Sequence, residues 1–226
     1  MNILIFILSA LFFLLAVIVV YKYFGKNGLY SYICFATILA NIAASKSIEL
    51  FGLATSAGSV LFASTFLCTD ILSEKHGKKA SKKSVWLGLL ISILWMVGTQ
   101  VTILFNPSET DFIHESMKTV FGLVPRITIA SLVAYIVSQL LDIFMYYFIW
   151  NKTGNNKSKM YLRNIGSTLV SQLVDTIIFV TIAFLNVHPF KVFIQILLTT
   201  YFFKIVVAFL STPFAYIARN IETVEE

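Results

Sequence analysis

Seven long runs of mainly apolar residues constrain the fold of this chain more than any other feature of its sequence. In an α-helix, about 20 residues with a rise of about 1.5 Å each cross the hydrocarbon core of a bilayer. Of the 226 residues, 58% are hydrophobic and 12% are charged, which is more apolar surface than a soluble domain of this size can bury. The runs are residues 3–23, 29–47, 59–74, 84–105, 127–150, 164–185 and 192–215.

These runs predict an all-α, polytopic helical membrane protein with about seven transmembrane helices in one domain over residues 1–226. The first run has the length of a signal peptide. Its lysines, however, follow the apolar stretch instead of preceding it, and no clear small-residue cleavage site follows. We therefore expect an uncleaved N-terminal helix in addition to a core of six helices.

The positions of the lysines predict how these helices are oriented in the membrane. Residues 74–84 form the most basic loop, residues 151–163 form a second, and Lys22 and Lys26 follow the first run. With seven crossings, all these loops fall on one side, and basic loops are typical of the cytoplasmic side. We predict an N-terminus outside and a C-terminus in the cytoplasm. Because the net charge of +6 comes from such loops, it does not indicate a nucleic-acid partner.

One polar phrase, Ser-Gln-x-x-Asp, occurs in two consecutive runs, at residues 138–142 and 171–175. A carboxylate in the middle of a membrane span costs about 2.5–3.5 kcal/mol, so a lipid-facing accident is a poor explanation for Asp142 and Asp175. Consecutive spans run antiparallel, so the two phrases would face each other with opposite polarity, as an inverted helix pair. We predict that both aspartates line a polar chamber halfway through the bilayer.

Other polar residues within or at the edges of the runs extend this predicted site. Lys204 lies near the centre of its run, where it needs an acidic partner, and Asp142 and Asp175 are the candidates. Alternatives stay open, because Ser and Gln commonly join membrane helices without further function, and arginines at span edges can reach the headgroups. The remaining predicted site residues are Asn41, Lys46, Asp70, Glu74, Arg126, Tyr135, Gln139 and Gln172.

Asp70 and Glu74 have a competing interpretation. They fall near the end of a predicted helix, where the helix dipole disfavours acids, and they could pair with the lysines that follow. Two loops also have predicted features. Residues 49–58 form a short turn-rich link, and residues 106–125 are long enough for an interfacial helix. Its apolar face would consist of Phe112, Met117, Val120 and Phe121.

Signals of catalysis or metal binding are missing from the sequence. His76, His114 and His188 are scattered over separate loops, and the two cysteines have no CxxC spacing. No nucleophile motif, P-loop or dinucleotide-binding loop is present. We therefore expect no enzymatic activity, no metal and no cofactor.

Three stretches together resemble the queuosine precursor transporter family, also called the vitamin uptake transporter family. The first is Asn-Ile-Ala-Ala-Ser-Lys at residues 41–46, followed by Phe51 and Gly52. The second is Thr-Asp-Ile-Leu-Ser-Glu-Lys-His-Gly-Lys-Lys at residues 69–79. The third runs from Pro125 and Arg126 through the first Ser-Gln-x-x-Asp phrase to Arg163, Asn164 and the second phrase, ending at Thr176.

This resemblance implies uptake of queuosine precursors across a bacterial inner membrane: 7-deazaguanines such as preQ0 and preQ1, or the base queuine. A carboxylate such as Asp142 or Asp175 would accept hydrogen bonds from the adjacent N1–H and NH₂ of a guanine-type edge. Gln139, Gln172, Asn41 or Arg126 would donate to the O6 carbonyl, and Tyr135 offers an aromatic face. Asp70 or Glu74 would lie near the cytoplasmic exit.

Other functions stay open at this stage. A carboxylate with a glutamine also suits other small polar solutes, so a transporter for a different solute is the main alternative. A second alternative is the substrate-binding subunit of an energy-coupling-factor importer, which needs partner ATPases. The small residues at positions 40–45 could pack against a helix of the same chain or of a second copy, so a homo-oligomer also stays open. The lipid bilayer and a small-molecule substrate are the expected partners.

Overall fold

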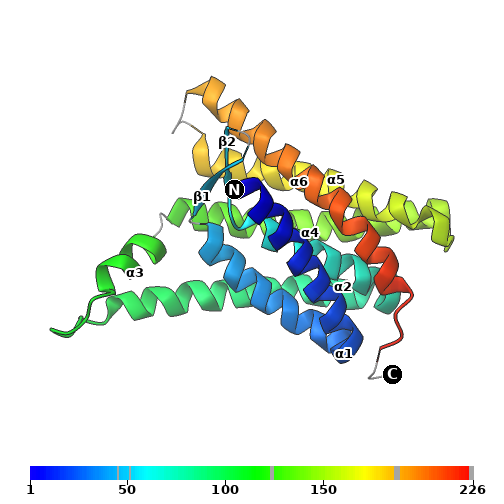
Figure 1. Ribbon diagram of the computed structural model, residues 1–226, viewed down its shortest axis with the longest axis horizontal. Coiled ribbons are helices and arrows are strands. Elements are labelled where there is room, and N and C mark those ends of the chain that lie inside the picture. The colour runs from blue at the N-terminus through cyan, green and yellow to red at the C-terminus, as the bar shows by residue number, and fades with distance from the viewer. Residues whose placement is uncertain (45, 51, 123–124, 186–188, 224–226) are drawn as a thin grey trace.

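The computed structural model describes the whole chain except residues 45, 51, 123–124, 186–188 and 224–226. Six α-helices, a two-stranded antiparallel hairpin and one 3₁₀ turn, η1, make up the described part (Figure 1). In chain order they are α1 (Asn2–Ala44), β1 (Ser47–Leu50), β2 (Leu53–Ser56), α2 (Ser59–Leu104), α3 (His114–Phe121), α4 (Pro125–Thr153), η1 (Lys157–Lys159), α5 (Met160–Phe184) and α6 (Phe190–Arg219).

The two longest helices, α1 and α2, each reverse direction at a glycine. Gly25 has φ 51° and ψ −142°, and Gly77 has φ 82° and ψ 171°, conformations that residues with a Cβ rarely adopt. Figure 1 shows each helix folding back on itself. The two halves of α1 are joined by Tyr32, whose hydroxyl donates to the Phe13 carbonyl over 3.1 Å. A straight helix of 43 residues would be about 65 Å long, about twice the thickness of a bilayer core.

Five helices are long and apolar enough to cross a membrane: α1, α2, α4, α5 and α6. Many of their large apolar side chains face outward, among them Phe12 at 65% exposure and Leu94 at 56%. In a soluble protein such surface would be a liability, whereas lipid covers it in a membrane. The prediction of a helical membrane protein is therefore confirmed.

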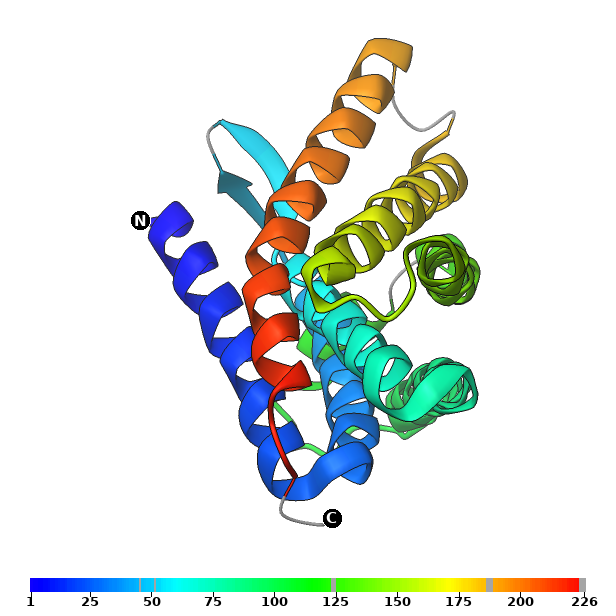
Figure 2. The same cartoon turned by 90° about the vertical axis from the view of Figure 1, so that its right-hand side faces the viewer.

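The two ends of the helix bundle differ in charge. The reversals within α1 and α2, the η1 turn and the C-terminus lie at the right-hand end of Figure 1, which faces the viewer in Figure 2. The hairpin and α3 lie toward the opposite end. Because the lysine-rich segments flank these reversals and η1, we call this the basic end and the opposite end the hairpin end. The lysines of the basic end include Lys22, Lys26, Lys78, Lys79 and Lys152.

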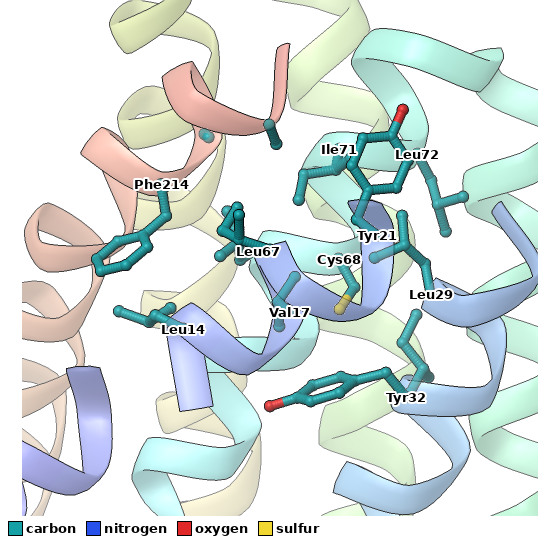
Figure 3. Close-up of a cluster of buried hydrophobic side chains, with 14 of the residues drawn as sticks. Leu14, Val17, Tyr21, Leu29, Tyr32, Leu67, Cys68, Ile71, Leu72 and Phe214 are labelled. Atoms are coloured by element: carbon teal, nitrogen blue, oxygen red, sulfur yellow. The ribbon is translucent and has the colours of Figure 1, made fainter. Parts of the chain in front are cut away.

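A cluster of apolar side chains holds both halves of α1 against α2 and α6. Leu14, Val17 and Leu29 are each no more than 1% exposed, and they meet Leu67 of α2 and Phe214 of α6 (Figure 3). The Tyr32 hydroxyl oxygen of this cluster also lies 3.1 Å from the Ser64 hydroxyl oxygen of α2, within hydrogen-bonding distance. Helix α1 therefore contributes mainly apolar packing, and most of the buried polar residues lie on α2, α4, α5 and α6.

The predicted second span is too long at its C-terminal end. Helix α1 ends at Ala44, and Lys46 follows it as an exposed residue, so its predicted position within a span is wrong. The predicted turn-rich link is instead a β-hairpin, in which Glu49 pairs with Ala54 and Gly52 turns the chain with φ 76°. Leu50 anchors the hairpin, because it is buried against side chains of α1, α2 and α6.

Helix α3 is shorter than the predicted interfacial helix. It begins at His114, so Phe112 lies before it and is 91% exposed. At its other end, the Phe121 ring packs edge-on against Trp95 with centroids 5.9 Å apart, and its carbonyl accepts a hydrogen bond from Gln100 over 2.6 Å. These contacts tether α3 to the second half of α2. Its position at the membrane surface stays a prediction.

Candidate functional site

The two Ser-Gln-x-x-Asp phrases interlock where α4 packs against α5. The Ser138 hydroxyl of α4 donates to Asp175 of α5 over 3.0 Å, and the Ser171 hydroxyl of α5 donates to Asp142 of α4 over 2.9 Å. Each phrase thus supplies a donor to the carboxylate of the other. This reciprocity follows from antiparallel helices with identical spacing, and it confirms that the two phrases face each other.

Asp175 forms an ion pair with Lys204 of α6 through its second carboxylate oxygen. The two side chains are 18% and 14% exposed, so the pair is neither sealed in the core nor open to the surroundings. The prediction that Lys204 requires an acidic partner is confirmed, and that partner is Asp175. The pair ties α5 to α6 near the middle of both helices.

Asp142 belongs to a different and fully buried group that includes Asp70 of α2. Both carboxylates are about 1% exposed, and they lie close enough to interact electrostatically. The Asn164 amide of α5 donates to Asp70, and the Thr212 hydroxyl of α6 donates to the Asn164 carbonyl oxygen over 3.1 Å. Two acids in one buried place are costly, and neutral donors compensate: Asn164 and Ser171 of α5 donate to the acids, and Thr212 of α6 supports Asn164.

Glu74 lies nearer the basic end and is held by two arginines. Arg163 of α5 donates to both carboxylate oxygens over 2.9 and 3.1 Å, and Arg219 of α6 lies 3.1 Å from one of them. The Tyr146 hydroxyl of α4 also donates to Glu74. The predicted alternative, pairing with the following lysines, is not what the structure shows. Arg163 is fully buried, so the alternative in which this span-edge arginine reaches the headgroups is not what the structure shows either.

A narrow pocket opens between α2, α5 and α6, beside the Asp175–Lys204 pair. Its polar lining includes Gln172 and Lys204, and its apolar lining includes the rings of Phe62 and Phe66. Its free volume of about 10 Å³ is about that of one water molecule. The other lining residues are Ser59, Ala63, Thr168, Ala208 and Ser211.

The pocket and the two acidic groups lie along one face of the first half of α2. Phe62, Phe66, Asp70 and Glu74 are spaced four residues apart, so each lies about one turn beyond the last and the row winds slowly around one side of the helix. This row leads from the pocket through the buried acids to the arginine-bound glutamate at the basic end. We call this row, together with Asp142 and Asp175 beside it, the polar path.

The other predicted site residues have mainly structural contacts. Gln139 is buried and bonded to Thr65 and Thr69 of α2 over 3.2 and 3.3 Å. Tyr135 is buried with its ring 6.4 Å from that of Phe62, so it supports the pocket wall from behind. Asn41 donates to the Thr37 carbonyl of its own helix over 2.8 Å.

Of the two remaining predicted residues, Lys46 is not brought to this site. Lys46 lies beyond the end of α1, next to the hairpin. Arg126 belongs to the first turn of α4, and its side chain lies outside the described part of the structure.

Three residues that the sequence did not assign to the site contact its acids directly or through one neighbour: Arg163, Asn164 and Thr212. Arg163 binds Glu74, Asn164 donates to one oxygen of Asp70, and Thr212 donates in turn to Asn164. A partial signal existed, because Asn164 precedes Thr168 and Gln172 at spacings of four and therefore shares their helix face. Among the described residues, no group of three His, Cys, Asp or Glu side chains could hold a metal ion.

The known proteins that are similar to this chain are all described as transporters. A family model described as "Putative vitamin uptake transporter" matches residues 56–218. A protein of Bacillus subtilis named "Probable queuosine precursor transporter" is 40% identical over 214 residues, covering 95% of this chain and 93% of that protein. A protein of Haemophilus influenzae with the same name is 29% identical over 163 residues, covering 70% and 66%. No solved structure matches the chain.

Proposed function

This chain belongs to the vitamin uptake transporter family, and on that premise we propose that it imports queuosine precursors across a bacterial inner membrane. The substrates would be 7-deazaguanine bases such as preQ0 and preQ1, or queuine, taken up for the modification of tRNA. The relative that covers most of the chain carries the name of such a transporter. Most of the matched family region lies in the helices that contribute the polar path.

The observation that carries the proposal is the reciprocal contact between the two Ser-Gln-x-x-Asp phrases. Purely structural polar contacts between membrane helices need no charge, yet here two carboxylates meet at one helix interface. A guanine-type edge presents two adjacent N–H donors, which one carboxylate can accept together. We assign Asp142 and Asp175 to the substrate path, with Gln172, Lys204 and Asp70 beside them.

Seven crossings follow if the two halves of α1 and of α2 each span the membrane. Both helices reverse at glycines, and both reversals lie at the basic end. The basic end would face the cytoplasm, because lysine-rich loops are retained there. The N-terminus would then lie outside and the C-terminus inside. The facing phrases of α4 and α5 would form an inverted pair at the midplane, where transporters commonly bind their solutes.

Complementation tests the function directly. The chain would be expressed in bacteria that lack both queuosine synthesis and their own importer, each precursor would be supplied separately, and queuosine in tRNA would be measured. We expect modification to depend on the chain. Its absence with every precursor, despite normal amounts of protein in the membrane, would refute the proposal and favour a different polar solute.

Variants in the same assay test the assigned acids. Asp142→Asn and Asp175→Asn should each abolish uptake while the protein still reaches the membrane. Glu115→Gln is the matched control, because Glu115 is an exposed acid on α3 whose side chain is 85% accessible. Retained uptake in both aspartate variants would remove these residues from the substrate path.

A further inference from the structure

We propose that the Lys204–Asp175 ion pair is the element that recognises the base, with the ring bound in the adjoining pocket. This inference rests on the proposed function and specifies its binding site. The ammonium group of Lys204 would donate to the carbonyl of a guanine-type edge, and the carboxylate of Asp175 would accept from the neighbouring N–H groups. One ion pair thus presents a donor beside an acceptor, the complement of an edge that presents an acceptor beside donors.

Burial distinguishes this pair from the other acids of the path. The Asp175 and Lys204 side chains keep 18% and 14% of their exposure, whereas Asp142 and Asp70 are about 1% exposed. Glu74 is engaged by two arginines and a tyrosine, so its carboxylate is already occupied. Of the acids along the polar path, Asp175 is therefore the one that a solute can reach without first breaking a sealed contact.

Both members of the pair keep unused hydrogen-bonding capacity. Asp175 accepts one bond on each oxygen, from Ser138 and from Lys204, and each carboxylate oxygen has two lone pairs. Lys204 has three N–H donors, and Asp175 takes one of them. A ligand edge can therefore add its bonds while the ion pair stays formed. Because the pair is neutral as a whole, binding the uncharged guanine-type edge leaves neither Asp175 nor Lys204 as an unpaired charge at membrane depth.

The pocket beside Lys204 supplies what a flat heterocycle needs. Phe62 and Phe66 lie one helical turn apart and offer aromatic faces, which bind a π system more strongly than aliphatic walls do. Gln172 lines the same pocket, and among the described residues its side-chain amide is joined to no other residue. This contrasts with Gln139, whose amide is bonded to Thr65 and Thr69. Gln172 is therefore available to bind a ligand, and Gln139 is not.

The small free volume indicates that binding is coupled to movement. A two-ring base is far larger than the space for about one water molecule that the pocket now provides. The wall formed by α2 and the wall formed by α5 and α6 must therefore separate when the base enters. Phe62 and Phe66 belong to α2, whereas Lys204, Asp175 and Gln172 belong to α5 and α6, so this movement would separate the aromatic wall from the polar wall.

An analogue without the exocyclic amine tests the recognition. Uptake of a labelled 7-deazaguanine would be measured in competition with the same base unlabelled and with its 7-deazahypoxanthine counterpart, which lacks one of the two adjacent donors. We expect the wild-type protein to prefer the amine-bearing base by about tenfold or more, as bidentate contacts to base edges usually provide. Lys204→Gln should weaken competition by both bases while keeping most of the preference.

Asp175→Asn, with or without Lys204→Gln, is expected to bring the preference close to one. The double variant is the control for Asp175→Asn alone, in which Lys204 keeps its charge but loses its acidic partner. Ligand-induced stabilisation of the purified proteins, measured as the rise in Tm with each base, gives the same ratio for variants that bind without transporting. The inference would be overturned if both aspartate variants kept the wild-type preference for the amine-bearing base. It would also be overturned if the wild-type protein did not distinguish the two bases. A wild-type protein that neither transports nor binds any 7-deazaguanine would instead refute the proposed function.

Discussion

The guanidinium group of Arg163 holds the carboxylate of Glu74 through two hydrogen bonds of 2.9 and 3.1 Å at the basic end of the bundle. Arg163 is itself fixed, because it donates to the Gly154 carbonyl over 2.9 Å and lies 4.5 Å from the centre of the Trp150 ring. This contact joins α2 to α5 three residues before α2 reverses at Gly77. Glu74 thus secures the bundle where its chain turns, which favours a structural role over the predicted contact with substrate.

Arg163→Met should destabilise the protein strongly. The side chains of Arg163 and Glu74 are 0% and 3% exposed, and removing one partner of a buried pair costs about 3–5 kcal/mol because the other charge stays buried. Thermal unfolding in detergent would measure the loss. Lys118→Met is the matched control, since it breaks the exposed Lys118–Glu115 pair and should change little. Equal effects of the two substitutions would contradict the structural role of Glu74.

Gly77→Ala should also lower stability, for a purely conformational reason. A Cβ at this position would meet no atom within 4 Å, so no clash is involved. The backbone, however, has φ 82° and ψ 171°, a region that costs other residues about 1–3 kcal/mol. Gly98→Ala provides the comparison, because Gly98 lies inside a helical half of α2 with equally open surroundings, and alanine favours a helix there by up to about 1 kcal/mol. A stabilised Gly77→Ala protein would argue against the reversal.

Gly88→Ala tests the packing behind the pocket. An added Cβ would lie 2.0 Å from the hydroxyl oxygen of buried Tyr135, so the tyrosine ring must move. Overpacking of this kind costs about 1–3 kcal/mol. We expect lower stability and weaker uptake, because Tyr135 supports the Phe62 ring that lines the pocket. Adding Tyr135→Phe, which removes the clashing oxygen, should restore part of both, and no rescue would mean that the damage arises elsewhere.

Much of the helical framework could be predicted from the sequence, because lipid-facing helices must be long and apolar. The predicted helix boundaries were wrong where local turns and hydrogen bonds determine the end of a helix. The span over residues 29–47 ends early, since the hairpin begins at Ser47 and Gly52 allows its tight turn. Helix α3 is short, since Asp111 accepts backbone hydrogen bonds from Ile113 and His114 and so fixes where the helix begins.

The sequence predicted which residues of the candidate site need a partner, because a charge inside a membrane is costly. It did not predict which partner each residue has, because that depends on how the helices pack. Lys204 needed an acid, but only the packing of α5 against α6 selects Asp175 over Asp142. Gln139 and Gln172 have identical positions in the two phrases, yet one faces Thr65 and Thr69 and the other faces the pocket. Sequence spacing gives the helix face of a residue, not its neighbour across the interface.

Labelling of single cysteines tests the proposed orientation. In a protein whose Cys34 and Cys68 are replaced by alanine, Lys79→Cys lies at the basic end and Thr110→Cys precedes α3. Both positions are exposed. A membrane-impermeant maleimide added to whole cells should label Thr110→Cys only, and Lys79→Cys should react after the membrane is opened. The reverse pattern would invert the orientation, and labelling of both in whole cells would refute the crossing between them.

The reciprocal serine contacts should be unequal in energy although they are identical in sequence. Ser171→Ala removes a donor from Asp142, which is fully buried, and such a loss costs about 1–3 kcal/mol. Ser138→Ala removes a donor from Asp175, which keeps Lys204 and is partly exposed, so its cost should be smaller. Thermal unfolding of both variants in detergent would measure the difference. Ser92→Ala is the control, since buried Ser92 donates to the Gly88 carbonyl of its own helix and not to a carboxylate. A larger loss for Ser138→Ala than for Ser171→Ala would contradict the assignment of Asp142 to the sealed core and of Asp175 to the accessible side.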